Sequence, residues 1–375
     1  MTARLAPICL AYVLSFGALG AITPYLAWQL REAGLSGMVL TLALIASPAI
    51  RLVAGPVWAV VADRLRISGQ LLRLGAGLAT VGAVVLCLGP GAALPGAILF
   101  ALGRAPLDAL LEGVTLTALG PDASGYGRVR LWGSFGFLAA ALGTGWSMEH
   151  DGPSPLQVCA ALSGLCALLT VALPTPERFR PAPVLPALRA VAGIPQVPWF
   201  LLACTLHFFS HTGATFFMPA HIASLGGAAS WTGVGVALGV TVEIAIMARS
   251  RALFARLSPD KVILLSAVVA IPRWLGTALA TSAVQVALLQ TLHGVTFGAF
   301  WVAAVARMAA FSPLEVRTSS NALLAAAIAV GSLLGNLAGP WFVEHADTRD
   351  LFYAMAGASL LSVPLAWRAA GGAHG

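Results

Sequence analysis

Residues 36–66 read SGMVLTLALIASPAIRLVAGPVWAVVADRLR, an apolar run that ends in a short charged turn. Between positions 36 and 62 the only charged side chain is Arg51. A helix of about 20 apolar residues crosses the hydrocarbon core of a bilayer, and little other than a helix is tolerated there. This stretch therefore predicts a transmembrane helix, and the rest of the chain repeats its pattern.

The whole chain alternates between long apolar runs and short polar gaps. It is 59% hydrophobic and 9% charged over 375 residues. We expect twelve spans, at 5–29, 36–62, 70–89, 94–119, 128–148, 155–173, 197–224, 231–250, 261–281, 284–309, 314–342 and 350–368. Twelve helices of about 20 residues use roughly 240 residues, which leaves no room for a soluble catalytic domain. The sequence thus predicts an all-α membrane protein with twelve transmembrane helices in two six-helix bundles.

Lysine and arginine separate by side of the membrane. The amino-terminus and alternate loops hold Arg4, Arg64, Arg66, Arg73, Arg128, Arg130, Arg178, Arg180, Arg189, Arg249, Arg251, Arg256, Lys261, Arg307, Arg317 and Arg368. The opposite loops hold only Arg31 and Arg349. Because basic loops stay in the cytoplasm, we expect both termini there and the chain in the cell (inner) membrane. The formal charge of +7 then reflects these loops and not a nucleic-acid partner.

The gap from Pro174 to Pro198 is rich in proline, which breaks helices and favours extended chain. We expect a cytoplasmic linker at 175–196 between a bundle at 1–174 and a bundle at 197–375. Each half has a basic loop after its second span, at 63–66 and at 249–261. A duplicated six-helix unit leaves such repetition.

Ionisable side chains inside the expected spans are the candidate functional groups. They are Arg51, Arg104, Asp108, Glu112, Glu243, Arg273 and His293. A charged group facing lipid costs about 2.5–3.5 kcal/mol on insertion scales, so these side chains must face protein or a water-filled cavity.

Arg104, Asp108 and Glu112 follow one another at intervals of four residues, which places them on one face of a helix. One reading is a structural ion pair between Arg104 and Asp108. The other is a proton switch, because a carboxylate in low dielectric exchanges its proton as an arginine approaches and leaves. The sequence leaves open which of the two carboxylates carries the proton.

Glu243 and Arg273 lie in the middle of spans 231–250 and 261–281. Glu243 is either a satisfied interior acid or a proton-carrying or substrate-facing carboxylate. Arg273 offers a donor fork for an anion or for Glu243. His293 is a residue type that titrates near physiological pH, and it serves equally well as a hydrogen bond between helices.

Metal and cofactor sites are not expected. His207 and His211 lie four residues apart, but no nearby carboxylate completes a ligand set, so polar lining of a cavity is the preferred interpretation. The five cysteines all lie within apolar stretches and lack paired loop spacing.

The turn after the second span resembles a loop of the major facilitator superfamily, which usually reads Gly-x-x-x-Asp-Arg-x-Gly-Arg-Arg. Here residues 58–68 read WAVVADRLRIS, so Asp63 and Arg64 are kept, while the expected glycines and basic residues are replaced by Ala59, Arg66, Ile67 and Ser68. The resemblance covers the whole chain and implies transport by alternating access between two bundles, with a gating role for Asp63 and Arg64.

Further motifs are similar to the phenylpropionate permease branch, near the oligosaccharide and nucleoside proton symporters. They are YGRVRLWGSFGF at 126–137, PLDAL at 106–110, IPRW at 271–274 and QTLHGVTFG at 290–298.

In lactose-permease-like relatives an acid and an arginine 18 positions later bind substrate, which matches Glu112 and Arg130. Asp108 also fits if the loop length differs. The sugar-stacking aromatic residue, seven positions after that arginine, corresponds to Phe137. Those relatives also have a histidine at the position of His293, and a proton-carrying glutamate follows it three residues later. Thr296 stands at that position here, so the resemblance leaves Glu243 and the acids at 108 and 112 as coupling candidates.

We therefore expect a monomeric secondary transporter that moves a small organic solute together with protons. The substrate-binding candidates are Arg51, Arg104, Glu112, Arg130, Phe137, Arg273 and His293, and the proton-coupling candidates are Asp108, Glu112 and Glu243. The arginines favour an aromatic or other carboxylate, with a sugar or nucleoside next. A proton-antiport exporter of hydrophobic or toxic compounds is the alternative on the same fold. The sequence has no P-loop for ATP-driven transport, and no hydrolase or metalloprotease motif that would indicate an enzyme.

Overall fold

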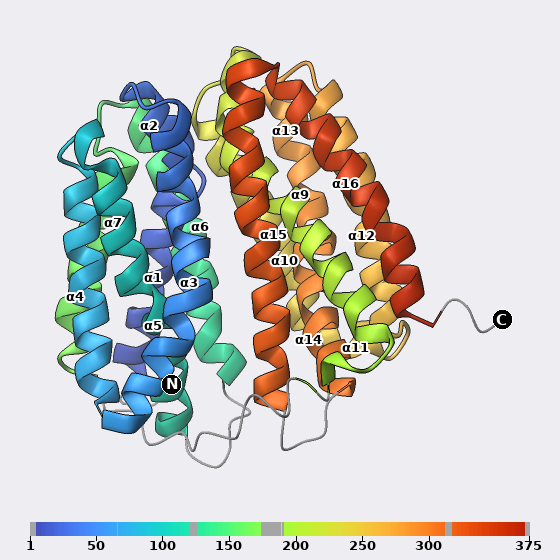
Figure 1. Cartoon of the computed structure of the whole chain (residues 1–375). Helices are drawn as coiled ribbons and strands as arrows, with labels where there is room; N and C mark the ends of the chain where they lie inside the picture. Colours follow the sequence, from blue (N-terminus) through green and yellow to red (C-terminus); the bar gives the residue numbers. More distant parts are fainter. Residues whose placement is uncertain are drawn as a thin grey trace. The chain divides into compact units, whose positions relative to one another are not determined.

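The computed structural model describes residues 5–65, 67–119, 126–173, 189, 191–311 and 317–371. The regular structure in these ranges is entirely helical (Figure 1). The chain forms two compact units, Met1–Arg180 and Pro181–Gly375. Most of the linker expected at 175–196 lies outside the described residues.

The first unit contains seven labelled α-helices and one short 3₁₀ turn among its described residues. Their bounds are α1 Ala6–Ile22, α2 Leu26–Glu32, α3 Gly37–Leu65, α4 Ser68–Leu86, η1 Pro90–Ala92, α5 Ala93–Leu119, α6 Tyr126–Glu149 and α7 Pro155–Thr170. The second unit contains α9 Gln196–Ser224, α10 Ser230–Ala248, α11 Ser250–Phe254, α12 Pro259–Leu279, α13 Ala283–Leu289, η3 Gln290–Leu292, η4 Gly294–Ala299, α14 Phe300–Ala310, α15 Arg317–His345 and α16 Thr348–Ala369.

Each expected span coincides with a helical segment. Within the described residues, eight helices are long and apolar enough to cross a membrane, or nine if the bent pair α1 and α2 is one span. The other three expected spans correspond to α5, α6 and α7. These are 27, 24 and 16 residues long, and α5 carries three charged residues, Arg104, Asp108 and Glu112. The expected all-helical architecture is confirmed.

Two spans are not the single continuous helices that the apolar runs predicted. The first is bent by 47° between α1 and α2, at a break that contains Pro24, which has no N–H to continue the helix. The expected span 284–309 is interrupted by the 3₁₀ turn η3 and by η4, which is a π-helix. Hydropathy does not reveal such interruptions because it does not report backbone register.

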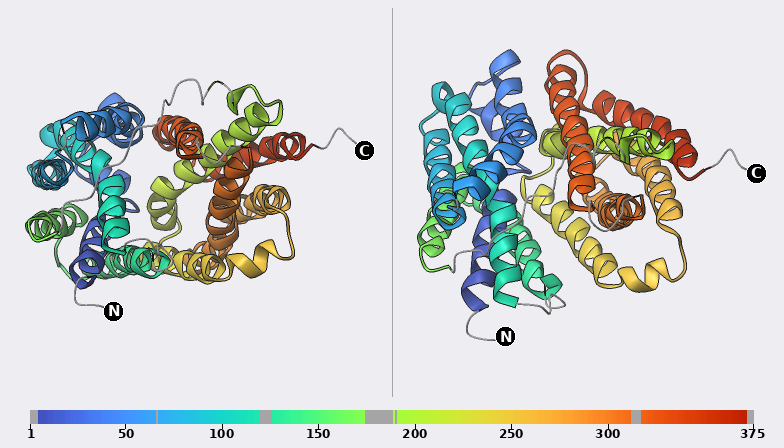
Figure 2. Two further views of the ribbon diagram at one scale, coloured as in Figure 1. Left: turned by 90° about the horizontal axis from the view of Figure 1, so that it is seen from below. Right: turned by 60° about the horizontal axis from the view of Figure 1, so that its bottom comes forward.

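The two units repeat one packing scheme. In the first, α1 packs against α6 and α7, α5 packs against α3 and α4, and α4 also packs against α7. In the second, α9 packs against α15 and α16, α10 packs against η4, and α12 packs against α14 and α16. Each of the five contacts in one unit therefore has a counterpart in the other, and the left view of Figure 2 looks roughly along the helices.

Glycines allow the counterpart pairs α1–α6 and α9–α15 to approach closely. A Cβ on Gly136 would collide with the carbonyl oxygen of Val13, and a Cβ on Gly331 would collide with that of Thr205. Small residues at such crossings allow the backbones of membrane helices to pack directly.

The counterpart helices α6 and α15 also end alike. In each, a histidine near the last turn donates from Nδ1 to the backbone carbonyl of a tryptophan four residues earlier. The distances are 2.9 Å for His150 and Trp146 and 3.0 Å for His345 and Trp341. Both tryptophans are more than half exposed, as expected for rings at a membrane–water boundary. These shared details support an internal duplication.

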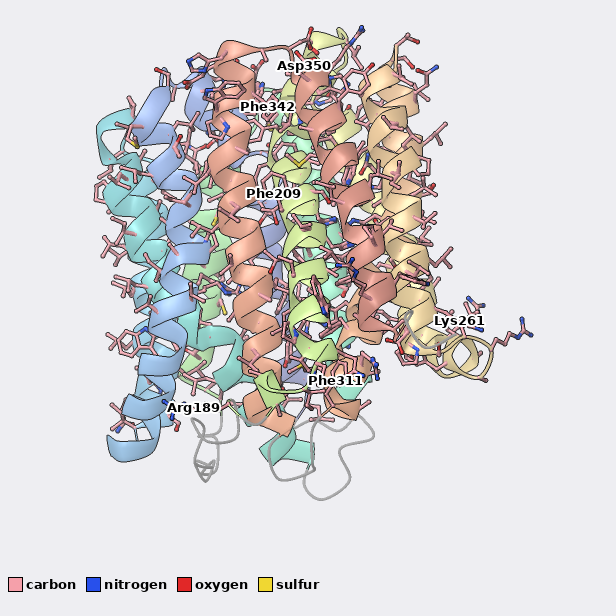
Figure 3. All side chains as sticks on the ribbon, turned by 45° about the vertical axis from the view of Figure 1, so that its right-hand side comes forward. Arg189, Phe209, Lys261, Phe311, Phe342 and Asp350 are labelled. Carbon is pink, nitrogen blue, oxygen red and sulfur yellow. The ribbon has the colours of Figure 1, made fainter. Side chains whose placement is uncertain are left out.

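The two ends of the helices in the second unit carry different residues. Figure 3 shows Arg189, Lys261 and Phe311 toward one end of this unit and Phe342 and Asp350 toward the other. At the first end Arg307 pairs with Asp260 at 2.7 Å. At the other end Asp347 caps α16 by accepting from the N–H of Arg349, and this hydrogen bond holds the pKa of the Asp347 carboxyl below its ordinary value.

Candidate functional site

The first unit brings two arginines to one carboxylate. Asp108 accepts from Arg104 at 2.6 Å, one turn earlier on α5, and from Arg51 of α3 at 3.2 Å. Arg104 is 5% exposed, whereas the Arg51 side chain is 53% exposed and the Asp108 side chain is 26% exposed. Asp108 therefore bridges a buried cation and an accessible one.

Helix α1 supplies the rest of this cluster. Arg104 donates to the hydroxyl of Ser15 and also contacts its backbone carbonyl oxygen. Arg130 of α6 stacks on the ring of Phe16 with its guanidinium carbon 4.0 Å from the centroid, and it lies 5.8 Å from the ring centroid of Tyr12. Such cation–π contacts stabilise an arginine without neutralising it.

The second unit contains a larger polar cluster around Arg273 of α12, which is 2% exposed. Its Nη1 donates to the hydroxyl of Thr296 at 2.7 Å, and its Nη2 donates to Oε1 of Gln290 at 2.6 Å. It also contacts Nδ1 of His293 at 3.3 Å and Nδ1 of His211 at 3.5 Å, while its guanidinium carbon lies 4.1 Å from the ring centroid of Trp274. All its Nη partners are neutral groups, so this buried positive charge has no carboxylate in direct contact among the described side chains.

Glu243 joins this cluster through a histidine. Oε2 of Glu243 lies 3.3 Å from Nε2 of His293, and Nδ1 of the same ring faces Arg273. An arginine can only donate, so Nδ1 must accept, and the proton of the neutral imidazole then lies on Nε2 and points to Glu243. His293 therefore bridges the arginine and the glutamate, which the sequence left as a possible direct pair.

A proton added to Nδ1 would place two N–H donors against each other and break the contact with Arg273. A proton added to Glu243 would instead remove the negative charge that His293 faces. Only the first of these events alters a direct contact of Arg273, because Glu243 faces His293 and not the arginine.

The remaining predicted residues are placed as follows. His207 and His211 of α9 point to different partners, the carbonyl of Thr296 and the Arg273 guanidinium, and no cluster of three or more metal-ligating residues occurs in the described part of the chain. The backbone of Phe137 lies against Gly20. The aromatic ring on which the Arg130 guanidinium stacks is that of Phe16. The side chains of Glu112, Asp63 and Arg64 lie outside the described residues.

Several functional neighbours were missed from the sequence. Ser15 and Phe16 are ordinary residues for an apolar span and gave no signal. Gln290 and Thr296 do carry one, because they lie three residues before and after the predicted His293, and polar residues at intervals of three along an apolar span favour a single face.

Comparison with known proteins agrees with this fold. The model of the MFS_1 like family matches residues 5–354. A maltose permease of Geobacillus stearothermophilus is 26% identical over 338 residues, covering 89% of this chain and 84% of the permease. A protein named probable 3-phenylpropionic acid transporter, from Escherichia coli (strain K12), is 30% identical over 196 residues, covering 51% of this chain and 52% of that protein.

Solved structures give the same result for the fold. The nucleoside transporter NupG superposes with a TM-score of 0.83 at 17% identity, covering 99% of both chains. The major facilitator superfamily transporter FucP, in its outward conformation, superposes with a TM-score of 0.63 at 17% identity, covering 98% of this chain and 99% of that one. The chain belongs to the MFS_1 like family and is a membrane transporter, not an enzyme.

Proposed function

We propose that this member of the MFS_1 like family is a secondary active transporter that moves a small organic solute together with protons by alternating access. The observation that carries the proposal is the Arg273–His293–Glu243 arrangement in the second unit. It combines a buried cation that lacks a direct anion with a titratable ring and a carboxylate. Membrane-embedded groups of this kind are typical of proton relays and substrate sites.

Arg273 is the proposed link between proton and substrate. Its charge is compensated by Glu243 only through His293, so protonation of Glu243 leaves Arg273 available to an anionic or hydroxylated solute. Release of the solute and of the proton restores the present arrangement. In the first unit Asp108, together with Arg104 and Arg51, is the second candidate for coupling.

The proposed substrate is an aromatic or other carboxylate, with a sugar or nucleoside next. Arg130 supports this choice, because its guanidinium contacts only rings among the described side chains and so retains its capacity for a carboxylate. The names of the relatives, a maltose permease and a probable 3-phenylpropionic acid transporter, cover the same range of solutes. Arg51, Arg104, Glu112 and Phe137 remain proposed members of the substrate site.

The remaining expectations are proposals of the same kind. We propose a monomer in the inner membrane with both termini in the cytoplasm, bundles at 1–174 and 197–375 joined by a cytoplasmic linker at 175–196, and gating by Asp63 and Arg64. The basic end of the second unit, which holds Arg189 and Lys261, supports the orientation (Figure 3).

Uptake into proteoliposomes with an imposed proton gradient tests the function. The assay compares radiolabelled 3-phenylpropionate, maltose and uridine in the wild type, Glu243→Gln and the exposed control Glu32→Gln. We expect gradient-driven accumulation of one solute in the wild type and in the control. The Glu243→Gln variant should lose accumulation but keep exchange of solute across the membrane.

Accumulation by Glu243→Gln at the wild-type level would remove Glu243 from the coupling mechanism. Expulsion of cationic dyes on the same proton gradient, with no accumulation of any of the three solutes, would replace the proposal with the exporter function.

A further inference from the structure

The π-helix η4, Gly294–Ala299, lies directly beside the Arg273 cluster. It follows the 3₁₀ turn η3 and His293, so the backbone changes from a tight to a wide helical register within one span. Short π-helical stretches are rare, and they occur frequently at functional sites.

Neighbouring helices contact the backbone carbonyls of the π-helix. His207 of α9 donates from Nε2 to the carbonyl oxygen of Thr296 at 2.6 Å. The hydroxyl of Ser266 of α12 shares its proton between the carbonyl oxygen of Val295, at 2.9 Å, and that of Val262 in its own helix, at 2.8 Å. Such external partners satisfy carbonyls in a region where the regular hydrogen-bond ladder is altered.

His207 is fixed in a single role. Its ring is 2% exposed and stacks on Phe300, with the centroids 4.0 Å apart and the planes within 8°. Because a carbonyl can only accept, the proton of the ring lies on Nε2. Nδ1 is buried and has no hydrogen-bond partner among the described residues, so His207 is neutral and serves the Thr296 carbonyl alone.

Thr296 connects this backbone contact to the site. Its carbonyl accepts from His207, while its hydroxyl accepts from Arg273. On another side the π-helix packs on α10 through two glycines. A Cβ on Gly294 would collide with Val242, and one on Gly298 would lie 2.8 Å from Cγ of Glu243. A shift of register in η4 would therefore displace the Thr296 hydroxyl and the helix face against which Glu243 packs.

We propose that His207 is a positioning residue for the transport site. Its hydrogen bond to the Thr296 carbonyl holds the π-helical register that places the Thr296 hydroxyl on Arg273 and His293 between Arg273 and Glu243. The effect of His207 on transport rests on the proposed function, whereas its effect on the register of η4 rests on these contacts alone.

Two substitutions of His207 separate the hydrogen bond from the packing. His207→Phe keeps a ring on Phe300 and removes the donor, whereas His207→Gln places an amide donor near the position of Nε2. His221→Phe is the matched control, because His221 is also buried on α9 and donates from Nε2 to a carbonyl of α12, that of Thr277, at 2.9 Å.

The experiment measures hydrogen–deuterium exchange of the peptide covering 290–300, together with the KM and the pH profile of solute uptake. We expect His207→Phe to increase exchange in this peptide, to raise KM about tenfold, the change that corresponds to one lost buried hydrogen bond, and to alter the pH profile. His207→Gln should approach the wild type. His221→Phe should leave exchange at 290–300, KM and the pH profile unchanged.

Wild-type exchange at 290–300 in His207→Phe would overturn the structural part of the proposal. Increased exchange with wild-type KM and pH profile would overturn the positioning role. Failure of the proposed function is distinguishable, because then the wild type itself would show no proton-driven uptake. If His207→Phe does not fold, Ser266→Ala tests the register with little change of volume, and unchanged exchange at 290–300 in that variant would count against the proposal.

Discussion

Removal of the Asp108 charge is the sharpest test of the first unit. In Asp108→Asn the buried Arg104 loses its only carboxylate partner among the described side chains, which lies at 2.6 Å. Leaving a buried charge unpaired costs about 3–5 kcal/mol. Asp108 is 26% exposed, and Arg104 keeps its contacts with Ser15. We therefore expect the free energy of unfolding to fall by about 2–4 kcal/mol, below the full penalty.

Two further variants isolate the buried pair. Arg51→Ala removes the partner whose side chain is 53% exposed, and exposed pairs contribute about 0–1 kcal/mol. The double variant Arg104→Gln, Asp108→Asn removes both charges and leaves neutral groups in their place. Because only the exposed Arg51 is then left without its carboxylate and no buried charge is unpaired, it should recover about half of the loss seen in Asp108→Asn.

Thermal unfolding of the purified protein in detergent, followed by tryptophan fluorescence, measures these differences. For a unit of about 180 residues, 1 kcal/mol shifts Tm by about 2–4 °C, so Asp108→Asn should lower Tm by about 5–15 °C. A Tm for Asp108→Asn equal to that of Arg51→Ala would refute the reasoning. So would a double variant as unstable as the sum of its single substitutions.

Three other changes test separate features of the structure by the same unfolding assay or by ligand binding. Gly136→Ala should destabilise by about 1–3 kcal/mol because its Cβ overpacks the contact between α1 and α6, whereas Gly143→Ala, which meets nothing within 4 Å, should not. Asp347→Ala should lose about 1 kcal/mol of capping at neutral pH. Because the pKa of this carboxyl is lowered in the folded protein, its stabilisation is present above the ordinary carboxyl pKa, and the difference from the wild type should vanish as pH falls below the lowered value. Arg130→Lys should weaken substrate binding at least about tenfold, measured by thermal shift, because an ammonium lacks the planar fork that both stacks on Phe16 and binds a carboxylate in a bidentate manner.

The sequence predicted the fold well because hydropathy reports directly on burial in a bilayer. Span positions and the all-helical class followed from the apolar runs alone. The bend near Pro24 and the π-helix did not, because they depend on individual backbone hydrogen bonds. From the sequence, the internal repeat was recognised only in the basic loops. The tryptophan and histidine at the ends of α6 and α15 are a closer match between the two halves.

The charges of the candidate site and the Arg104–Asp108 contact could be predicted from the sequence, but its other connections could not. The cost of burying a charge identified Arg104, Asp108, Glu243 and Arg273, because it applies to any charged residue in a span. Neutral partners such as Ser15 carry no such penalty and are frequent in membrane helices, so sequence alone does not single them out. Partner choice also depends on which helices pack together, and an apolar pattern specifies a buried face without specifying the helix opposite it.

The two clusters differ in a way that bears on coupling. In the first unit Asp108 contacts two arginines directly, and its protonation would leave both without their carboxylate. In the second unit His293 separates Arg273 from Glu243, and each nitrogen of the ring has a different partner. A proton on Nδ1 of the ring would break its contact with Arg273, whereas a proton on Glu243 would remove the negative charge that the ring faces. The first arrangement is suited to holding helices together, and the second to changing state. Substitution of Glu243 should therefore affect coupling more than stability, and substitution of Asp108 should affect stability first.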